Sequence, residues 1–173
     1  VTADPNMRLI FASAGGGERM ELQFSRDFMA WTKHDVPEVS IDAPLVFVGY
    51  GMVAPEYQWD DYKGVDVAGK VLVMLINDPP VPDRKNPSAL DENVFKGKAM
   101  TYYGRWTYKY EMAAEKKAAG CIIIHETGPA GYPWEVVGNN TGERFDLGSP
   151  DKGMSRAAVE GWEGDVEHDD VRR

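Results

Sequence analysis

Histidines are the first residues to consider, because imidazole is the commonest zinc ligand and general base in proteins. The chain has 173 residues and three histidines: His34, His125 and His168. A catalytic zinc needs three protein ligands on a rigid scaffold. His168 and Asp170 form a His-x-Asp pair, but no apolar strand precedes this acidic segment. His34 lies in a polar run and His125 ends an apolar one, so we predict no metal site and a satisfied, structural His125.

Carboxylate pairs and serines are the other candidates for catalysis. Asp60 and Asp61 are adjacent in the sequence, as are Asp91 and Glu92, and adjacent side chains rarely converge on one substrate atom. The first pair fits a turn, in which aspartate side chains accept hydrogen bonds from the backbone. None of the serines has the sharp strand-to-helix setting of a serine nucleophile. The sequence therefore predicts no catalytic residue.

Composition and charge argue against several classes of protein. The chain has 19 Lys and Arg against 28 Asp and Glu, a net charge of −9, which disfavours binding to a nucleic-acid backbone. Mean hydropathy is −0.44, and the apolar runs are too short for a membrane span. The single cysteine, Cys121, opens an apolar run and is expected to be buried and inert. The first residues show no signal peptide.

Apolar runs separated by turn residues predict the strands. The expected strands are residues 7–12, 20–24, 45–48, 71–76 and 121–124. The glycine triplet at residues 15–17 predicts a hairpin between the first two. The run at residues 71–76 is continuously β-branched and aliphatic, which is typical of a strand buried on both faces, and the run at 121–124 is fully apolar. The proline-rich segment 77–98 predicts a long loop that is either functional or mobile.

One clear helix is expected over residues 105–119. Trp106, Tyr110 and three alanines recur at helical spacing, so they are the expected buried face. Gly120 is the expected stop, and the apolar run after it completes a strand–helix–strand unit. Residues 151–173 are acidic, with few side chains to bury, which predicts a linker or tail after a domain spanning residues 1–150.

Aromatic residues beside basic ones are the strongest candidates for binding. In the loop before the predicted helix, two tyrosines lie beside an arginine, and this composition is typical of protein interfaces. The alternative is that the tyrosines cover the domain's own core and leave only their hydroxyls in water. A later Gly- and Pro-rich segment allows the same two interpretations. The candidate binding residues are Tyr102, Tyr103, Arg105, Tyr132 and Trp134.

Four stretches together resemble the protease-associated domain of secreted di-zinc aminopeptidases. They are Phe-Met-Ala-Trp-Thr-Lys at 28–33, Leu-Val-Phe-Val-Gly-Tyr-Gly-Met-Val-Ala-Pro-Glu-Tyr-Gln-Trp-Asp-Asp at 45–61, Tyr-Tyr-Gly-Arg-Trp-Thr-Tyr-Lys at 102–109 and Cys-Ile-Ile-Ile-His-Glu-Thr at 121–127. The peptidase family concerned includes aminopeptidase Y and glutamate carboxypeptidase II. The resemblance extends over residues 4–147, most of the chain.

The resemblance implies an α+β fold, a β-sandwich or barrel flanked by helices, in a secreted or periplasmic protein. The family's zinc ligands and general base have no matching positions in this sequence. The chain is therefore expected to be a non-catalytic accessory domain without a cofactor, and zinc is expected only in a separate catalytic domain. The implied partners are that peptidase catalytic domain and a peptide or protein substrate, with no nucleic acid and no membrane span.

Two other functions stay open from the sequence. The first is a small-ligand or carbohydrate-binding module that stacks its ligand on the aromatics between Tyr102 and Tyr110. The second is a self-sufficient hydrolase that uses His125 with Glu126 or an aspartate, which the missing ligand set disfavours.

Overall fold

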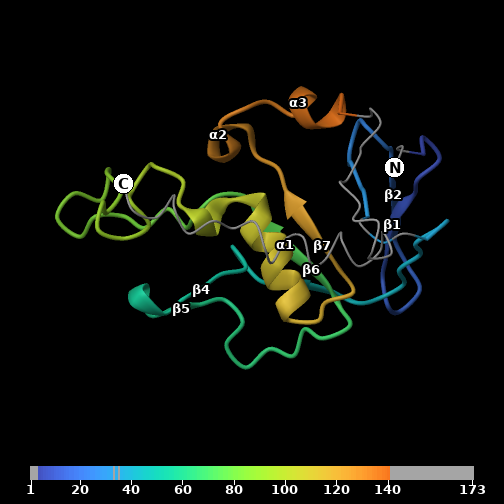
Figure 1. Ribbon diagram of the computed structural model, residues 1–173, viewed down its shortest axis with the longest axis horizontal. Coiled ribbons are helices and arrows are strands. Elements are labelled where there is room, and N and C mark those ends of the chain that lie inside the picture. The colour runs from blue at the N-terminus through green and yellow to red at the C-terminus, as the bar shows by residue number, and fades with distance from the viewer. Residues whose placement is uncertain (1–3, 33, 35, 141–173) are drawn as a thin grey trace, which may run out of the picture. The chain divides into compact units, whose positions relative to one another are not determined.

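The computed structural model describes residues 4–32, 34 and 36–140. The chain divides into two compact units, one made of Val1–Ser40 and Glu135–Arg173 and the other of Ile41–Trp134. Helices occur together with small sheets, so the predicted α+β class is confirmed (Figure 1). The finer sandwich or barrel and the boundary at residue 150 stay predictions. The predicted tail, residues 151–173, lies outside the described residues.

The first unit contains the predicted hairpin. Strands β1 (Leu9–Ala12) and β2 (Arg19–Leu22) pair antiparallel, with Leu9 opposite Leu22. The glycine turn is confirmed, because Gly16 has a positive φ of 68° and its N–H donates to the Ser13 carbonyl. The alternating apolar residues Met20, Leu22 and Phe24 predict a half-buried face, which is confirmed for Leu22 and Phe24 but not for Met20, which is 58% exposed.

A small cluster completes the first unit. Phe28 is buried, and its ring meets that of Phe24 edge to face at 5.8 Å between centroids. Helix α3 (Glu135–Gly138) buries Val137. The Ser25 hydroxyl donates to the Gly138 carbonyl over 2.8 Å and ties this helix to the segment after the hairpin.

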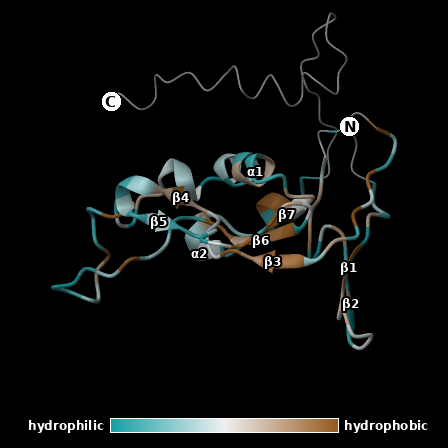
Figure 2. Cartoon of the chain, turned by 90° about the horizontal axis from the view of Figure 1, so that it is seen from below, coloured by the Kyte–Doolittle hydropathy of each residue, from teal (hydrophilic) through white to brown (hydrophobic). Residues whose placement is uncertain are grey.

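The second unit is built on a parallel sheet of three strands. Its order is β3 (Leu45–Phe47), β6 (Val71–Leu75) and β7 (Gly120–Ile124), with β6 central. These strands agree with the prediction to within one residue at each end. Helix α1 (Trp106–Glu115) connects β6 to β7 and lies along one side of the sheet, and all three strands are strongly apolar (Figure 2).

Only one face of this sheet is fully buried, and the predicted burial of β6 on both faces is confirmed only in part, because Val71, Val73 and Leu75 are partly buried. Leu72 and Met74 of β6 are 0% exposed and pack with the buried residues of α1. On the other face, Leu45, Phe47 and Ile124 are 46%, 62% and 40% exposed. The apolar runs determine where the strands form. Among the described residues, helix α1 covers only one face of the sheet.

The predicted buried face of the helix is confirmed at Ala113 but not at Trp106 and Tyr110. Its buried residues are Tyr108, Lys109, Met112 and Ala113, whereas Trp106 and Tyr110 are only partly buried. The helix ends earlier than expected because Lys117 takes a left-handed conformation, with φ of 57°. The Ala118 N–H then donates to the Ala113 carbonyl, which closes the last turn before Gly120 begins β7.

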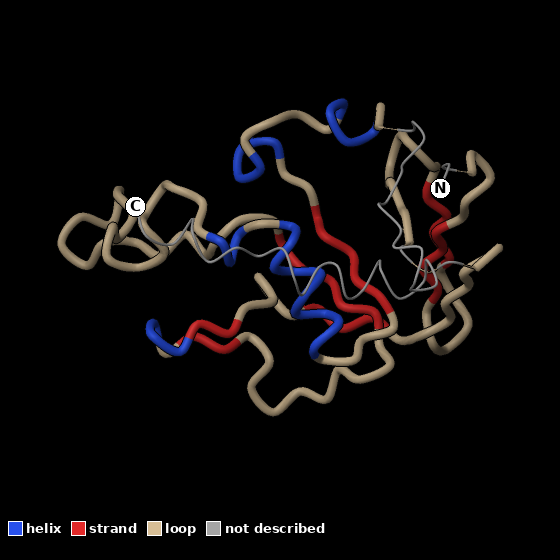
Figure 3. The backbone as a smooth tube through the Cα atoms, viewed as in Figure 1, coloured by secondary structure: helices blue, strands red, loops and turns tan. Residues whose placement is uncertain are grey.

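The remaining elements lie around the ends of the sheet strands. Strands β4 (Val53–Ala54) and β5 (Trp59–Asp60) form a short antiparallel pair around the 3₁₀ turn η1 (Pro55–Tyr57). Helix α2 (Thr127–Ala130) follows β7, and a second 3₁₀ turn, η2 (Tyr102–Gly104), precedes α1. The long segment between β6 and η2 has no helix or strand of its own (Figure 3).

That long segment places Phe95 in the core, and its Val81 and Val94 pack against the core cluster. Phe95 is 0% exposed, and its ring lies 4.5 Å from that of Tyr57 and 5.6 Å from that of Trp59, between centroids. None of the helices in the described residues is long and apolar enough to cross a membrane.

Candidate functional site

The predicted binding loop is the η2 turn, and it lies against the end of β6. The Asn77 N–H donates to the Gly104 carbonyl over 3.1 Å. A Cβ atom on Gly104 would lie 3.0 Å from backbone atoms of Asn77 and Asp78, so only glycine permits this approach. Asn77 itself has a φ of 72°, in the left-handed region, where the backbone turns out of the strand.

A buried aspartate holds the start of the turn. Asp78 is 7% exposed, and it accepts hydrogen bonds from the N–H and the hydroxyl of Thr101, over 2.6 and 2.8 Å. The Thr101 hydroxyl oxygen in turn accepts from the Tyr103 N–H. Burial raises the pKa of the Asp78 carboxyl, while the bonds from Thr101 act to lower it. Thr101 therefore links the end of β6 to η2.

A buried lysine holds the other side of the turn. Lys109 is 0% exposed, and its ammonium donates to the carbonyl oxygens of Tyr50, Asn77 and Tyr103, over 2.7, 3.2 and 3.3 Å. Burial lowers the pKa of Lys109 to about 8, against the effect of the Asp78 and Asp61 carboxylates, which raise it. The ends of β3 and β6 and the η2 turn thus meet at one charged group.

The three candidate residues of the turn differ in exposure. Tyr102 is 40% exposed, its hydroxyl donates to Glu111 over 2.6 Å, and burial and this bond raise its pKa to about 12. Arg105 is exposed and makes no ion pair within the described part of the chain. Tyr103 is partly buried: its ring packs on that of Tyr108. The prediction of an exposed loop therefore holds for two residues, and the core alternative applies to Tyr103.

Tyr132 and Trp134 are partly buried and surround His125. Their ring centroids lie 5.2 and 5.8 Å from that of His125, and the Tyr132 ring also meets Trp106 at 6.2 Å. His125 Nε2 lies 3.1 Å from the Tyr132 carbonyl, which can only accept, so Nε2 carries the proton. Nδ1 is buried and has no partner among the described residues, so the prediction of a satisfied histidine is wrong for this nitrogen.

The aspartates before the buried Tyr62 act in a turn, as predicted. Asp61 accepts from the Met52 N–H over 3.0 Å and from the Trp59 indole N–H over 2.8 Å. Asp60 accepts from the Tyr62 N–H over 2.8 Å. These carboxylates fasten the β4–β5 pair to the end of β3.

Among the described residues there is no group of three or more His, Cys, Asp or Glu that could hold a metal ion. His168 and Asp170 lie outside those residues. Cys121 is partly buried, and this burial raises the pKa of its thiol to about 12, which disfavours the nucleophilic thiolate.

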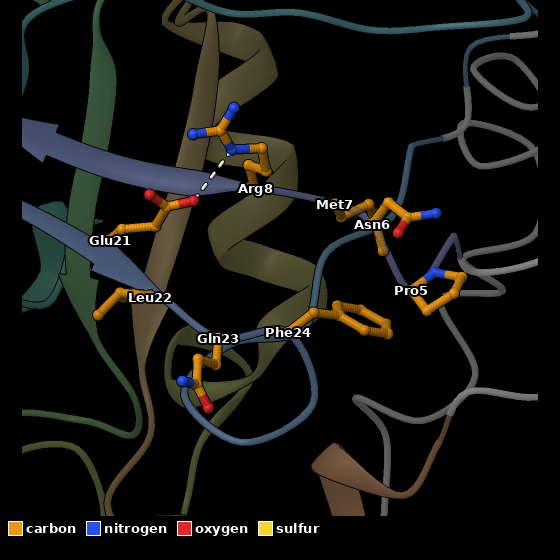
Figure 4. A pocket seen from close by; sticks show the side chains of 8 residues that line it. All are labelled: Pro5, Asn6, Met7, Arg8, Glu21, Leu22, Gln23 and Phe24. Carbon is orange, nitrogen blue, oxygen red and sulfur yellow. Dashed lines mark hydrogen bonds and ion pairs between the residues drawn. The ribbon is translucent and has the colours of Figure 1, made fainter.

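An open depression lies beside the hairpin of the first unit, with a volume of about 550 Å³ (Figure 4). Arg8 and Glu21 line it and form an ion pair of 3.0 Å, and the Phe24 ring lies at its other side. None of the predicted binding residues lines this depression.

No protein-family model, curated protein or solved structure matches this chain. The geometry of the site includes residues that sequence reasoning missed. Lys109, Asp78 and Thr101 carry the polar contacts of η2, yet none was a candidate. For Lys109 a signal exists: it precedes Met112 and Ala113 by three and four residues, which places a charge on the apolar face of the helix.

Proposed function

We propose that this chain is a non-catalytic accessory domain of a zinc metallo-aminopeptidase that contacts proteins or peptides through the η2 surface. The η2 surface consists of Tyr102, Tyr103 and Arg105. The observation that carries the proposal is an exposed tyrosine and an exposed arginine on a turn that buried polar bonds fix to the sheet. Side chains of this kind, held in place before binding, are favoured at interface hot spots.

The polar groups around the turn support contact rather than catalysis. Glu111 accepts from the Tyr102 hydroxyl and Glu56 from the Tyr103 hydroxyl, over 2.6 and 2.7 Å. Asp78 is engaged by Thr101. Each carboxylate therefore orients a neighbouring group of the turn. In the parent protein, the proposed partners are the peptidase catalytic domain and its peptide or protein substrate, in a secreted or periplasmic setting.

The hydrolase alternative is disfavoured by the surroundings of His125. Its Nε2 proton is directed to the Tyr132 carbonyl and its Nδ1 is buried, so neither nitrogen is offered to a substrate. The carbohydrate alternative is favoured by one observation, the 40% exposure of Tyr102, because an exposed ring can stack on a sugar.

A panel of ligands separates these functions. The ¹⁵N-labelled chain is titrated with short extended peptides that carry one carboxylate and one apolar side chain, and with neutral oligosaccharides of similar length. We expect peptides to shift the amide resonances of residues 101–106 in a saturable manner. Saturable shifts with the sugars alone would establish the carbohydrate module instead.

The same preparation is assayed for zinc and for hydrolysis of aminoacyl substrates. We expect no stoichiometric zinc and no hydrolysis. Bound zinc with chelator-sensitive peptidase activity would overturn the proposal of a non-catalytic domain.

A further inference from the structure

Lys109 is unusual among the charged residues that the structure describes, because no water reaches it and its three donors all go to backbone carbonyls. Lysine is almost never fully buried without a partner that compensates the lost hydration. The three carbonyls belong to Tyr50, Asn77 and Tyr103, which lie up to 59 residues from Lys109 along the chain. The lysine therefore joins segments that the sequence keeps far apart.

We infer that Lys109 is the positioning residue of the η2 surface, because its ammonium fixes the η2 turn to the ends of β3 and β6. The inference rests on the proposed function only for the statement that this surface binds a peptide. The hydrogen bond from Lys109 to the Tyr103 carbonyl also positions Tyr102 and Arg105, because Tyr103 lies between them in the chain.

The number of donors favours the charged form of the lysine for this role. An ammonium has three N–H donors, and three carbonyl oxygens lie within 3.3 Å of it. A neutral amine has two donors and would leave one of these carbonyls unbonded. Charge-assisted bonds of this kind are stronger than neutral ones.

The ionisable groups around Lys109 leave its donors available. Asp78 and Asp61 are the carboxylates whose charge acts on it. Asp78 is engaged by Thr101, and Asp61 by the N–H groups of Met52 and Trp59. The ring of Tyr50 lies with its centroid 5.9 Å from Nζ, and the phenol of Tyr103 is directed to Glu56.

The wild-type chain gives the first test, and it needs no substitution. NMR of the lysine side chains is recorded as a function of pH in the ¹³C,¹⁵N-labelled protein. We expect the ζ protons of one lysine, assigned to Lys109 through the chain, to be protected from water exchange and to show contacts with the Asn77–Asp78 and Tyr103–Gly104 backbone. Exchange as fast as that of surface lysines, without those contacts, would overturn the inference.

Two variants give the second test. Lys109→Met removes the donors but keeps an unbranched side chain, and the matched control, Met112→Ala, damages the same buried helix face without touching a carbonyl. Amide hydrogen exchange is measured for Asn77 and Arg105, whose N–H groups bond within the site. Relative to wild type, we expect K109M to accelerate these amides about tenfold more than M112A does. Equal acceleration in the two variants would make Lys109 an ordinary core residue.

Peptide binding distinguishes this inference from the proposed function. If the wild-type chain binds peptide at η2, K109M is expected to weaken that binding while M112A leaves it within about twofold. If the wild-type chain binds no peptide, the proposed function fails, whereas the exchange experiment and the ζ-proton contacts still decide the role of Lys109. A variant K109M that does not fold leaves the decision with the wild-type NMR measurement.

Discussion

The β1–β2 hairpin and the strand ends around η2 both join chain segments through charged side chains, but they do so in opposite surroundings. In the hairpin, Arg8 and Glu21 pair at 3.0 Å with 62% and 50% of their side chains exposed. Around η2, Lys109 and Asp78 are 0% and 7% exposed. Water and salt weaken the Arg8–Glu21 ion pair. Burial strengthens the hydrogen bonds that Lys109 and Asp78 make to their neighbours, and it makes any unbonded polar group there costly. We therefore expect substitutions of polar side chains to cost little in the hairpin and much at η2.

Lys109→Met should have the largest effect. It leaves three buried carbonyls without their donor, which costs more than is regained by no longer burying a charge, and we expect a loss of roughly 3 kcal/mol in the free energy of unfolding. Urea denaturation followed by tryptophan fluorescence measures it. Unchanged stability would mean that the buried lysine contributes nothing net to the fold.

Gly104→Ala should rank next. Its Cβ would lie 3.0 Å from the Asn77 and Asp78 backbone and 2.8 Å from Cγ of Met100, so the turn must move away from β6. We expect a loss of about 1–3 kcal/mol, the usual cost of overpacking. The control is Gly128→Ala, because a Cβ atom there meets nothing within 4 Å. A G104A protein as stable as G128A would show that η2 is not pressed against the strand end.

The pH dependence of stability is expected to carry a contribution from Lys109. Its pKa is about 8 in the folded chain and about 10.4 in an unfolded one, so the unfolded state binds more protons between these values. Stability contributed by this group is therefore lost as pH falls from about 10.4 to 8, by at most about 1.4 kcal/mol per pH unit.

Cys121 acts in the opposite direction over part of this range. Its thiol has a pKa of about 12 when folded and about 8.5 when unfolded, so its contribution to stability falls as pH rises above about 8.5. The free energy of unfolding is therefore measured as a function of pH for Cys121→Ala and for the double variant that also carries Lys109→Met. Parallel pH profiles for the two would contradict the depressed pKa of Lys109.

Arg8→Ala should have the smallest effect. The Arg8 bond lowers the pKa of Glu21, but both side chains are largely in water, so we expect a melting temperature indistinguishable from that of wild type. The melting temperature is measured by calorimetry at low salt, where screening of the Arg8–Glu21 ion pair is weakest. A clear loss of stability would show that the hairpin depends on its charges as η2 does.

The sequence predicts the sheet better than the site. The strands at residues 45–47, 71–75 and 120–124 follow from uninterrupted apolar runs bounded by glycine and proline, which are local signals. The face of α1 was misjudged because Trp106 and Tyr110 look like core residues, whereas the helix turns Tyr108 and Met112 inward. Phe95 was missed because it lies in a loop whose residues show no helical or strand periodicity.

The part of the candidate site that depends on local composition could be predicted from the sequence. The part that is formed by segments distant in the sequence could not. The exposure of Tyr102 and Arg105 follows from their place in a glycine-ended turn before a helix. The bonds of Lys109 to Tyr50 and Asn77 span 59 and 32 residues of sequence, and periodicity within one segment cannot reveal them. Tertiary packing, and not the residue type, places Lys109 in the core.

The most direct test of the central claim compares two double variants in peptide binding. Tyr102→Ala with Arg105→Ala removes the exposed side chains of the η2 surface. Phe47→Ala with Arg84→Ala removes an aromatic residue and an arginine that are exposed elsewhere in the same unit. Affinity is measured by calorimetry for the peptide that shifts residues 101–106 in the wild-type chain. We predict at least about a tenfold loss for the first variant, as for hot-spot residues, and no loss for the second. Equal affinities in both variants would contradict binding through the η2 surface.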